Sequence, residues 1–240
     1  MRHAAQTVVL TGVGRVGQVG EFVARRFAEG GASLAIIDRS ASEGEARADA
    51  LRASGFRASA FSCDLSNRSE VESVAARIVE QAGGAVHSLV NIAGGFDTSG
   101  DIAQSDPAKW QRQFSINHLT AYLATRSFLP ALRPGRGSIV YFASAAALPG
   151  GVTRGMAAYA AAKGAVLTLM RSVAEQEAMT GVRANAIAPS AIRTTANEES
   201  MGSDAAYIER SDVADAVLFL CSDDARAVSG QVLELKRIRR

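Results

Sequence analysis

Short apolar runs alternate with longer amphipathic segments over the whole chain. Seven runs have the length and composition of strands: residues 7–12, 33–38, 57–64, 88–94, 137–144, 182–189 and 231–235. Several of them are apolar at consecutive positions, which is typical of strands covered by helices on both faces of a sheet.

The segments between these runs place apolar residues three or four positions apart. Clear examples are residues 21–31, 69–84 and 158–178, and this spacing predicts amphipathic helices. Strands that alternate with helices form βαβ units and a parallel sheet. We therefore predict an α/β fold in which residues 1–240 form a single doubly wound Rossmann-type domain, with these seven strands in a parallel sheet and helices on both faces.

Composition narrows the class of protein. The chain has 240 residues and a formal net charge of +2, which is too small to indicate a nucleic-acid partner. Its two cysteines, Cys63 and Cys221, make neither a disulfide framework nor a CxxC spacing, so a reducing, cytoplasmic setting is expected. The first residues lack the apolar segment of a signal peptide, and no stretch of about 18 apolar residues predicts a membrane span.

The histidines and the basic end of the chain suggest no further site. His3, His87 and His118 are scattered, and none stands at metal-ligand spacing from a cysteine or carboxylate, so no metal is expected. Residues 235–240, LKRIRR, are expected to be a solvated terminus rather than an anion-binding segment.

In doubly wound sheets, ligands bind beyond the carboxyl ends of the strands. The predicted strands end on residues suited to that position: Gly12, Asp38, Asp64, Asn91, Ser144 and Pro189.

The loop TGVGRVGQVG, residues 11–20, follows the first predicted strand and precedes a helix. Gly12, Gly14 and Gly17 spell GxGxxG, and in this context the pattern predicts a pyrophosphate-binding loop. Glycines allow a tight turn and close approach of the backbone, and the helix N-terminus offers free N–H groups.

Asp38 ends the second predicted strand, about 20 residues after Gly17, where a carboxylate can accept hydrogen bonds from the adenosine ribose. Its charge would repel a 2′-phosphate, which favours NAD over NADP. Arg15 and Arg39 leave NADP possible, because either cation could pair with that phosphate.

Four polar side chains are candidates for catalysis. Tyr159 and Lys163, in YAAAK, stand four positions apart and share one face of a predicted helix. Ser144 ends a strand upstream of them, and Asn117 lies in a helical segment before that.

As an ordered set these residues resemble the short-chain dehydrogenase/reductase family. The resemblance covers nearly the whole chain and includes the glycine loop and the four catalytic candidates. It also includes CDL at 63–65, NIAG at 91–94, NAIAP at 185–189, and AVLFLCSD with SGQVLEL near the end.

The resemblance implies a role for each catalytic candidate. Tyr159 would be the general acid in carbonyl reduction and the base in alcohol oxidation. Lys163 would lower the pKa of Tyr159 and hold the nicotinamide ribose, Ser144 would donate to the substrate oxygen, and Asn117 would anchor a water that relays protons.

The resemblance also implies the cofactor-binding residues. They are Gly12, Gly14, Gly17, Val19, Gly20, Asp38, Asp64, Leu65, Asn91, Ala93, Gly94, Tyr159, Lys163, Pro189, Ile192 and Thr194. Among these, Asp64 and Leu65 would flank the adenine, and Ile192 and Thr194 would meet the nicotinamide amide.

The chain departs from the family pattern in two places near the cofactor. Its glycine loop is about two residues longer than TGxxxGxG, so Gly12 and Gly20 are its expected fixed ends, while Gly14 and Gly17 serve the extra length. The segment after Thr194 is short, which is typical of members with a small lid over an open cleft.

Two classes of function are weighed. The first is an NAD(P)-dependent oxidoreductase acting on a ketone, an aldehyde or a secondary alcohol, with 3-oxoacyl-thioester reductase and dihydropteridine-reductase-like activities among the possibilities. The second is a catalytically silent NAD(P)-binding sensor. The resemblance also implies a homodimer or homotetramer, joined through the helices that carry Asn117 and Tyr159.

Overall fold

The computed structural model describes residues 3–4 and 6–237, and their centre is one parallel sheet of seven strands. Residues 238–240 of the basic tail lie outside the described residues. The strands are β1 Thr7–Thr11, β2 Ser33–Asp38, β3 Arg57–Ser62, β4 Ser88–Asn91, β5 Ser138–Phe142, β6 Arg183–Pro189 and β7 Val232–Leu235. All seven predicted strands are confirmed.

The sheet order is β3-β2-β1-β4-β5-β6-β7, which confirms the doubly wound fold. On one side of the sheet β2 and β3 follow β1, and on the other side β5, β6 and β7 follow β4. In register, Thr11 of β1 lies beside Asn91 of β4. The order reverses between these two strands, and a ligand crevice is expected beyond their carboxyl ends.

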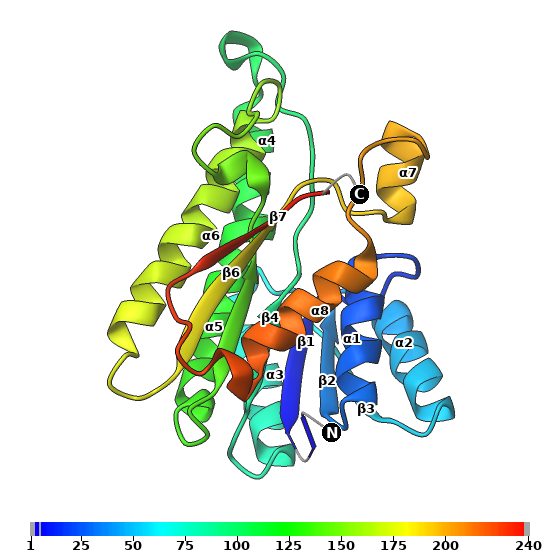
Figure 1. Cartoon of the computed structure of the whole chain (residues 1–240), viewed down its shortest axis with the longest axis vertical. Coiled ribbons are helices and arrows are strands. Elements are labelled where there is room, and N and C mark those ends of the chain that lie inside the picture. The colour runs from blue at the N-terminus through cyan, green and yellow to red at the C-terminus, as the bar shows by residue number, and fades with distance from the viewer. Residues whose placement is uncertain (1–2, 5, 238–240) are drawn as a thin grey trace.

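Helices cover both faces of the sheet. The α-helices are α1 Val19–Glu29, α2 Ala41–Ala53, α3 Arg68–Gln81, α4 Pro107–Phe114, α5 Thr120–Leu132, α6 Ala157–Gln176, α7 Thr195–Met201 and α8 Arg210–Cys221. In Figure 1, α1 and α8 lie in front of the sheet with α2 beside them, and α3 and α5 lie behind it. The short α7 stands beyond the upper end of the sheet, where the strands finish.

The alternation along β1 explains the two layers. Val8 and Leu10 pack into the core shared with α1 and α8, whereas Val9 packs into the core shared with α3, α5 and α6. All three are fully buried, as expected for a central strand covered on both faces.

None of the helices in the described part of the chain has the length and apolar character needed to cross a bilayer. Within that same part, no group of three or more histidine, cysteine or acidic side chains is placed to hold a metal ion.

Candidate active site

The glycine loop between β1 and α1 has two fixed ends. Gly12 adopts φ +71°, and a Cβ there would lie 2.6 Å from the Cα of Ala93, so this position requires glycine. A Cβ at Gly20 would lie 3.0 Å from the carbonyl oxygen of Gly12. The structure therefore places the predicted ends of the loop against each other and against the segment after β4.

Gly14 joins the loop to Asp38. Its N–H donates to Asp38 Oδ2 at 2.8 Å, and the N–H of Ser40 donates to Asp38 Oδ1 at 3.0 Å. A carboxylate oxygen can accept more than one hydrogen bond. The structure thus holds the Asp38 carboxylate at the end of β2, facing the loop.

The residues present fit a dinucleotide. Helix α1 begins without a side-chain cap on its N-terminal N–H groups, and such a helix end favours a phosphate. Gly12 leaves room for close backbone approach, and Asp38 offers acceptors at the neighbouring strand. Val19, the first residue of α1, is buried, so it offers its backbone rather than its side chain.

The four catalytic candidates gather around the ends of β4 and β5. Ser144 lies two residues after β5, and it is near enough to Tyr159 on α6 to influence the pKa of that tyrosine. Lys163, one turn further along α6, is buried, and its Nζ lies 5.8 Å from the centre of the Tyr159 ring. The sequence-based grouping of these side chains is therefore present as a structural cluster.

Asn117 reaches the same place from a single turn of π-helix, Ser115–Leu119, between α4 and α5. Its Nδ2 donates to the carbonyl oxygen of Gly95 at 2.9 Å and to Gln113 Oε1 at 3.0 Å, and its Oδ1 accepts from the N–H of Gly95 at 3.2 Å. These contacts fix the orientation of the Asn117 amide.

Gly94 lies between Asn117 and Lys163. A Cβ at Gly94 would be 2.5 Å from Asn117 Oδ1 and 3.3 Å from Lys163 Nζ. The absence of a side chain here lets the amide oxygen and the ammonium both approach the backbone of Gly94.

Burial shifts the pKa values of the pair on α6 in opposite directions. It lowers the pKa of Lys163 to about 8 and raises that of Tyr159, while the nearby Ser144 acts to lower the latter. The sequence-based expectation was that Lys163 would lower the pKa of Tyr159. In the protein without cofactor, desolvation raises the pKa of Tyr159 instead, because burial penalises the charge of the tyrosinate.

Phe96 places an aromatic ring beside Tyr159. Its ring meets the Tyr159 ring edge to face, with centres 5.2 Å apart, and it is 56% exposed. More than half of the Phe96 side chain is therefore open to solvent beside Tyr159.

The start of α6 is held by a residue that sequence reasoning missed. Ser99 Oγ accepts a hydrogen bond from the N–H of Ala158 at 3.4 Å, and the Ser99 N–H donates to the carbonyl oxygen of Gly155 at 2.8 Å. Ser99 lies 59 positions before Ala158, so no local capping pattern in the sequence predicts this contact.

Three other residues predicted to contact the nucleotide are Asp64, Leu65 and Asn91. Asp64 is exposed, and hydrogen bonds from Ser66 lower its pKa. The side chain of Leu65 belongs to the buried core. Asn91 is buried, and it donates to Thr125 Oγ1 of α5 at 3.4 Å.

The segment after β6 supplies the remaining predicted contacts. Pro189 is buried as the last residue of β6. Ile192 forms a parallel bridge with Ile208. Thr194 is buried, and its Oγ1 accepts from the N–H of Asn197 at 3.2 Å, which caps α7.

Comparison with known proteins places this geometry in context. The family model described as Enoyl-(Acyl carrier protein) reductase matches residues 12–235. The 2-(S)-hydroxypropyl-CoM dehydrogenase 3 of Xanthobacter autotrophicus is 33% identical, over 94% of this chain and 92% of its own length. The meso-2,3-butanediol dehydrogenase of Serratia marcescens is also 33% identical, over 96% and 92% of the two chains.

Solved structures with a similar fold carry names from the same family. A short-chain type dehydrogenase/reductase from Mycobacterium ulcerans superposes with a TM-score of 0.89 at 29% identity, covering 98% of this chain and 90% of that chain.

Proposed function

The chain belongs to the short-chain dehydrogenase/reductase family, and we propose on that premise that Tyr159 and Ser144 form its reacting pair. It is an NAD(P)-dependent oxidoreductase that interconverts alcohols and the corresponding carbonyl compounds. The hydrogen bond from Lys163 Nζ to the carbonyl oxygen of Phe142, at 2.7 Å, carries the assignment, because it holds the helix that bears Tyr159 against the end of β5, where Ser144 follows.

In carbonyl reduction, the Tyr159 hydroxyl gives its proton to the substrate oxygen while Ser144 donates a hydrogen bond to the same atom. Both interactions strengthen as negative charge develops on that oxygen, so they stabilise the transition state more than the ground state. In oxidation the proton returns to Tyr159. A bound nicotinamide dinucleotide supplies or accepts the hydride.

Lys163 and Asn117 support this proton transfer. The Lys163 ammonium lies beside Tyr159 and favours its anion by charge, and it is placed to hold the nicotinamide ribose. Asn117 Oδ1 and Lys163 Nζ flank Gly94, and we assign them to a water-mediated path that restores the Tyr159 proton. A sensor that only binds nucleotide would need none of these convergent groups.

We propose NAD as the preferred cofactor. The Asp38 carboxylate is held at the end of β2 by the N–H groups of Gly14 and Ser40. Its negative charge opposes a 2′-phosphate and its oxygens suit ribose hydroxyls. Arg15 and Arg39 are the cations that could reverse the preference.

We also propose a homo-oligomer that uses the outer surfaces of α4, α5 and α6. Phe114 and Tyr122, on this part of the chain, are 36% and 42% exposed, and exposed aromatic side chains are enriched at interfaces. Sedimentation of the purified protein tests this proposal.

A reducing compartment such as the cytoplasm suits the cysteines. Cys63 and Cys221 are both buried and free. Burial raises the pKa of Cys63 to about 11, so its reactive thiolate is scarce at neutral pH.

The function is tested by titrating the protein with NADH and with NADPH, following nicotinamide fluorescence. The better-bound nucleotide is then used against a panel of ketones and secondary alcohols. Binding followed by turnover is the expected result. Failure to bind either nucleotide would reject the proposal.

A further inference from the structure

The extra length of the glycine loop reaches the segment after β6. We call residues 190–210, which include α7 and end at the first residue of α8, the lid. The carbonyl oxygen of Gly17 accepts hydrogen bonds from Arg210 Nη1 at 2.7 Å and from the N–H of Thr195 at 3.2 Å. Gly17 has φ +74°, and a Cβ there would lie 2.1 Å from Thr195 Oγ1, so this contact requires glycine.

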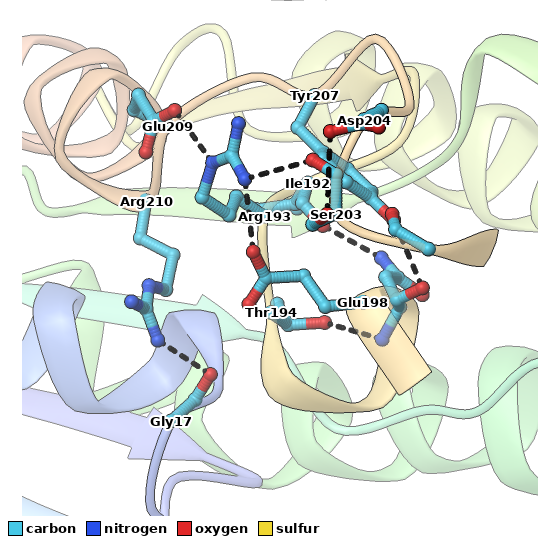
Figure 2. A network of polar contacts seen from close by, with 12 residues as sticks. Gly17, Ile192, Arg193, Thr194, Glu198, Ser203, Asp204, Tyr207, Glu209 and Arg210 are labelled. Carbon is cyan, nitrogen blue, oxygen red and sulfur yellow. Dashed lines mark hydrogen bonds and ion pairs between the residues drawn. The ribbon is translucent and has the colours of Figure 1, made fainter. Parts of the chain in front are cut away.

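The Arg210 side chain that bonds to Gly17 is itself held in place by α8 and by an aromatic ring. Arg210 is the first residue of α8, and its guanidinium lies 4.5 Å from the centre of the Phe22 ring on α1. Stacking on an aromatic face stabilises a guanidinium. Figure 2 shows the Arg210 side chain running from α8 to the loop carbonyl.

The N–H of Gly17 is fixed on the opposite side. It donates to Glu21 Oε2 at 2.7 Å, and Glu21 Oε1 accepts from Arg47 Nη1 at 2.8 Å. Arg47 is buried. Both polar backbone groups of Gly17 are therefore engaged, one toward α1 and α2 and the other toward the lid.

The lid itself is braced around Arg193. This guanidinium pairs with Glu198 and Glu209, both at 2.8 Å, and lies 5.0 Å from the centre of the Tyr207 ring. The N–H of Arg193 also donates to the carbonyl oxygen of Ile208 at 2.8 Å. Figure 2 shows Arg193, near one end of the lid, bonded to Glu209 near the other, so the two ends of the lid are tied together.

We propose that Arg210 is a positioning residue for the cofactor: through Gly17 it clasps the lengthened glycine loop to the lid and thereby slows cofactor exchange. The inference rests on the proposed function and on two contacts that the family resemblance implies: the loop with the diphosphate, and Thr194, next to Thr195, with the nicotinamide amide. The contact joins the two walls between which the middle of the cofactor would lie. Opening that passage breaks the bond to Arg210.

Arg210 contributes more to the clasp than Thr195. A hydrogen bond from a charged donor is about twice as strong as one between neutral groups, and the Arg210 bond is the shorter of the two. The guanidinium is also partly buried, so water competes with it less. Removing Arg210 is therefore the direct test.

The first measurement is hydrogen–deuterium exchange in the cofactor-free protein. Arg210→Met keeps a long side chain over Phe22 but removes the donor. We expect faster exchange in the glycine loop and in the lid, with the rest of the chain unchanged. The matched control is Arg26→Met, because Arg26 also links α1 to α8, through a 3.0 Å hydrogen bond from its Nε to Asp215, away from the loop.

The second measurement is the rate at which NADH dissociates, followed by stopped-flow displacement. Loss of a charged hydrogen bond predicts dissociation roughly tenfold faster in Arg210→Met. Arg210→Lys should fall between this variant and the parent protein, and Arg26→Met should match the parent. The KM for the cofactor should rise, while kcat for the carbonyl substrate changes little.

Two results would overturn the clasp: unchanged exchange of the loop and lid in Arg210→Met, or equal effects of the Arg210 and Arg26 variants. Unchanged NADH dissociation alongside faster exchange would reject its role in cofactor exchange. A parent protein that binds neither nucleotide would reject the proposed function and this role with it. The exchange experiment, which needs no cofactor, would still decide whether Arg210 holds the loop to the lid.

Discussion

The ammonium of Lys163 donates a 2.7 Å hydrogen bond to the carbonyl oxygen of Phe142. Phe142 is the last residue of β5, two positions before Ser144. This bond ties the helix that carries Tyr159 to the strand that presents Ser144. An ammonium has three donors, so the other two remain able to meet ribose hydroxyls.

The charge of Lys163 should set the pH dependence of reduction. Burial lowers its pKa to about 8, so the ammonium loses its proton as pH rises through that value. We expect kcat for carbonyl reduction to fall above pH about 8. Tyr159 is not the group that titrates there, because burial raises its pKa.

Lys163→Arg tests this assignment, since arginine keeps its charge throughout the accessible range. Its residual activity should show no fall near pH 8. A fall at the same pH as in the parent protein would mean that another group is responsible.

Tyr159→Phe should remove the proton donor while leaving its packing in place. The edge-to-face contact with Phe96 survives in phenylalanine. We expect kcat to fall by about 100- to 10,000-fold, with NADH affinity, measured by fluorescence, close to that of the parent. Turnover within a few-fold of the parent would exclude Tyr159 as the acid.

Asp38→Asn should relax the choice of cofactor. Asparagine retains a carbonyl oxygen for Gly14 but loses the negative charge. We expect NADPH affinity to rise by roughly tenfold, because one repulsive charge is removed. Asp49→Asn is the control, since it removes an exposed negative charge on α2 at a residue outside the predicted cofactor site. An equal gain in both variants would point to overall charge rather than to Asp38.

Gly94→Ala should damage catalysis more than folding. Its Cβ would overlap Asn117 Oδ1 and crowd Lys163 Nζ. We expect kcat to fall more than tenfold, as small displacements of catalytic groups have effects of this size. Gly95→Ala should cost much less, because its Cβ would meet only the flexible end of Ile116, at 3.1 Å. Similar losses in the two variants would contradict the steric argument.

Ser99→Ala should weaken the start of α6. Loss of a helix cap costs about 1 kcal/mol of unfolding free energy, and chemical denaturation measures it. Because the cap is next to Tyr159, kcat should fall as well. No change in either quantity would remove Ser99 from the support of the site.

The sequence predicted the strands because each is a compact apolar run bounded by helical periodicity. Those strand ends, together with the spacing of Tyr159 and Lys163, also located the catalytic cluster, which the structure brings together. The roles of these residues and of the cofactor contacts stay predictions.

What the sequence did not reveal are bonds between segments far apart in the chain. Arg210 is 193 positions from Gly17, and only the tertiary fold makes them neighbours. The π-helical turn that carries Asn117 has no local signal either, since its residues would also suit an α-helix. The pKa of Tyr159 depends on burial, which a sequence does not state.

The place of β1 in the sheet has a consequence for how the molecule is assembled. β1 pairs with β2, the next strand in the chain, on one edge. Its other edge pairs with β4, which comes later in the chain, and β5, β6 and β7 extend the sheet beyond β4. The half made of β1, β2 and β3 can form first as the chain leaves the ribosome. The crevice between β1 and β4 exists only after the second half has docked. A dinucleotide bound there would therefore act as a late folding ligand, stabilising the joined halves by mass action and raising the melting temperature as the logarithm of its concentration relative to its Kd.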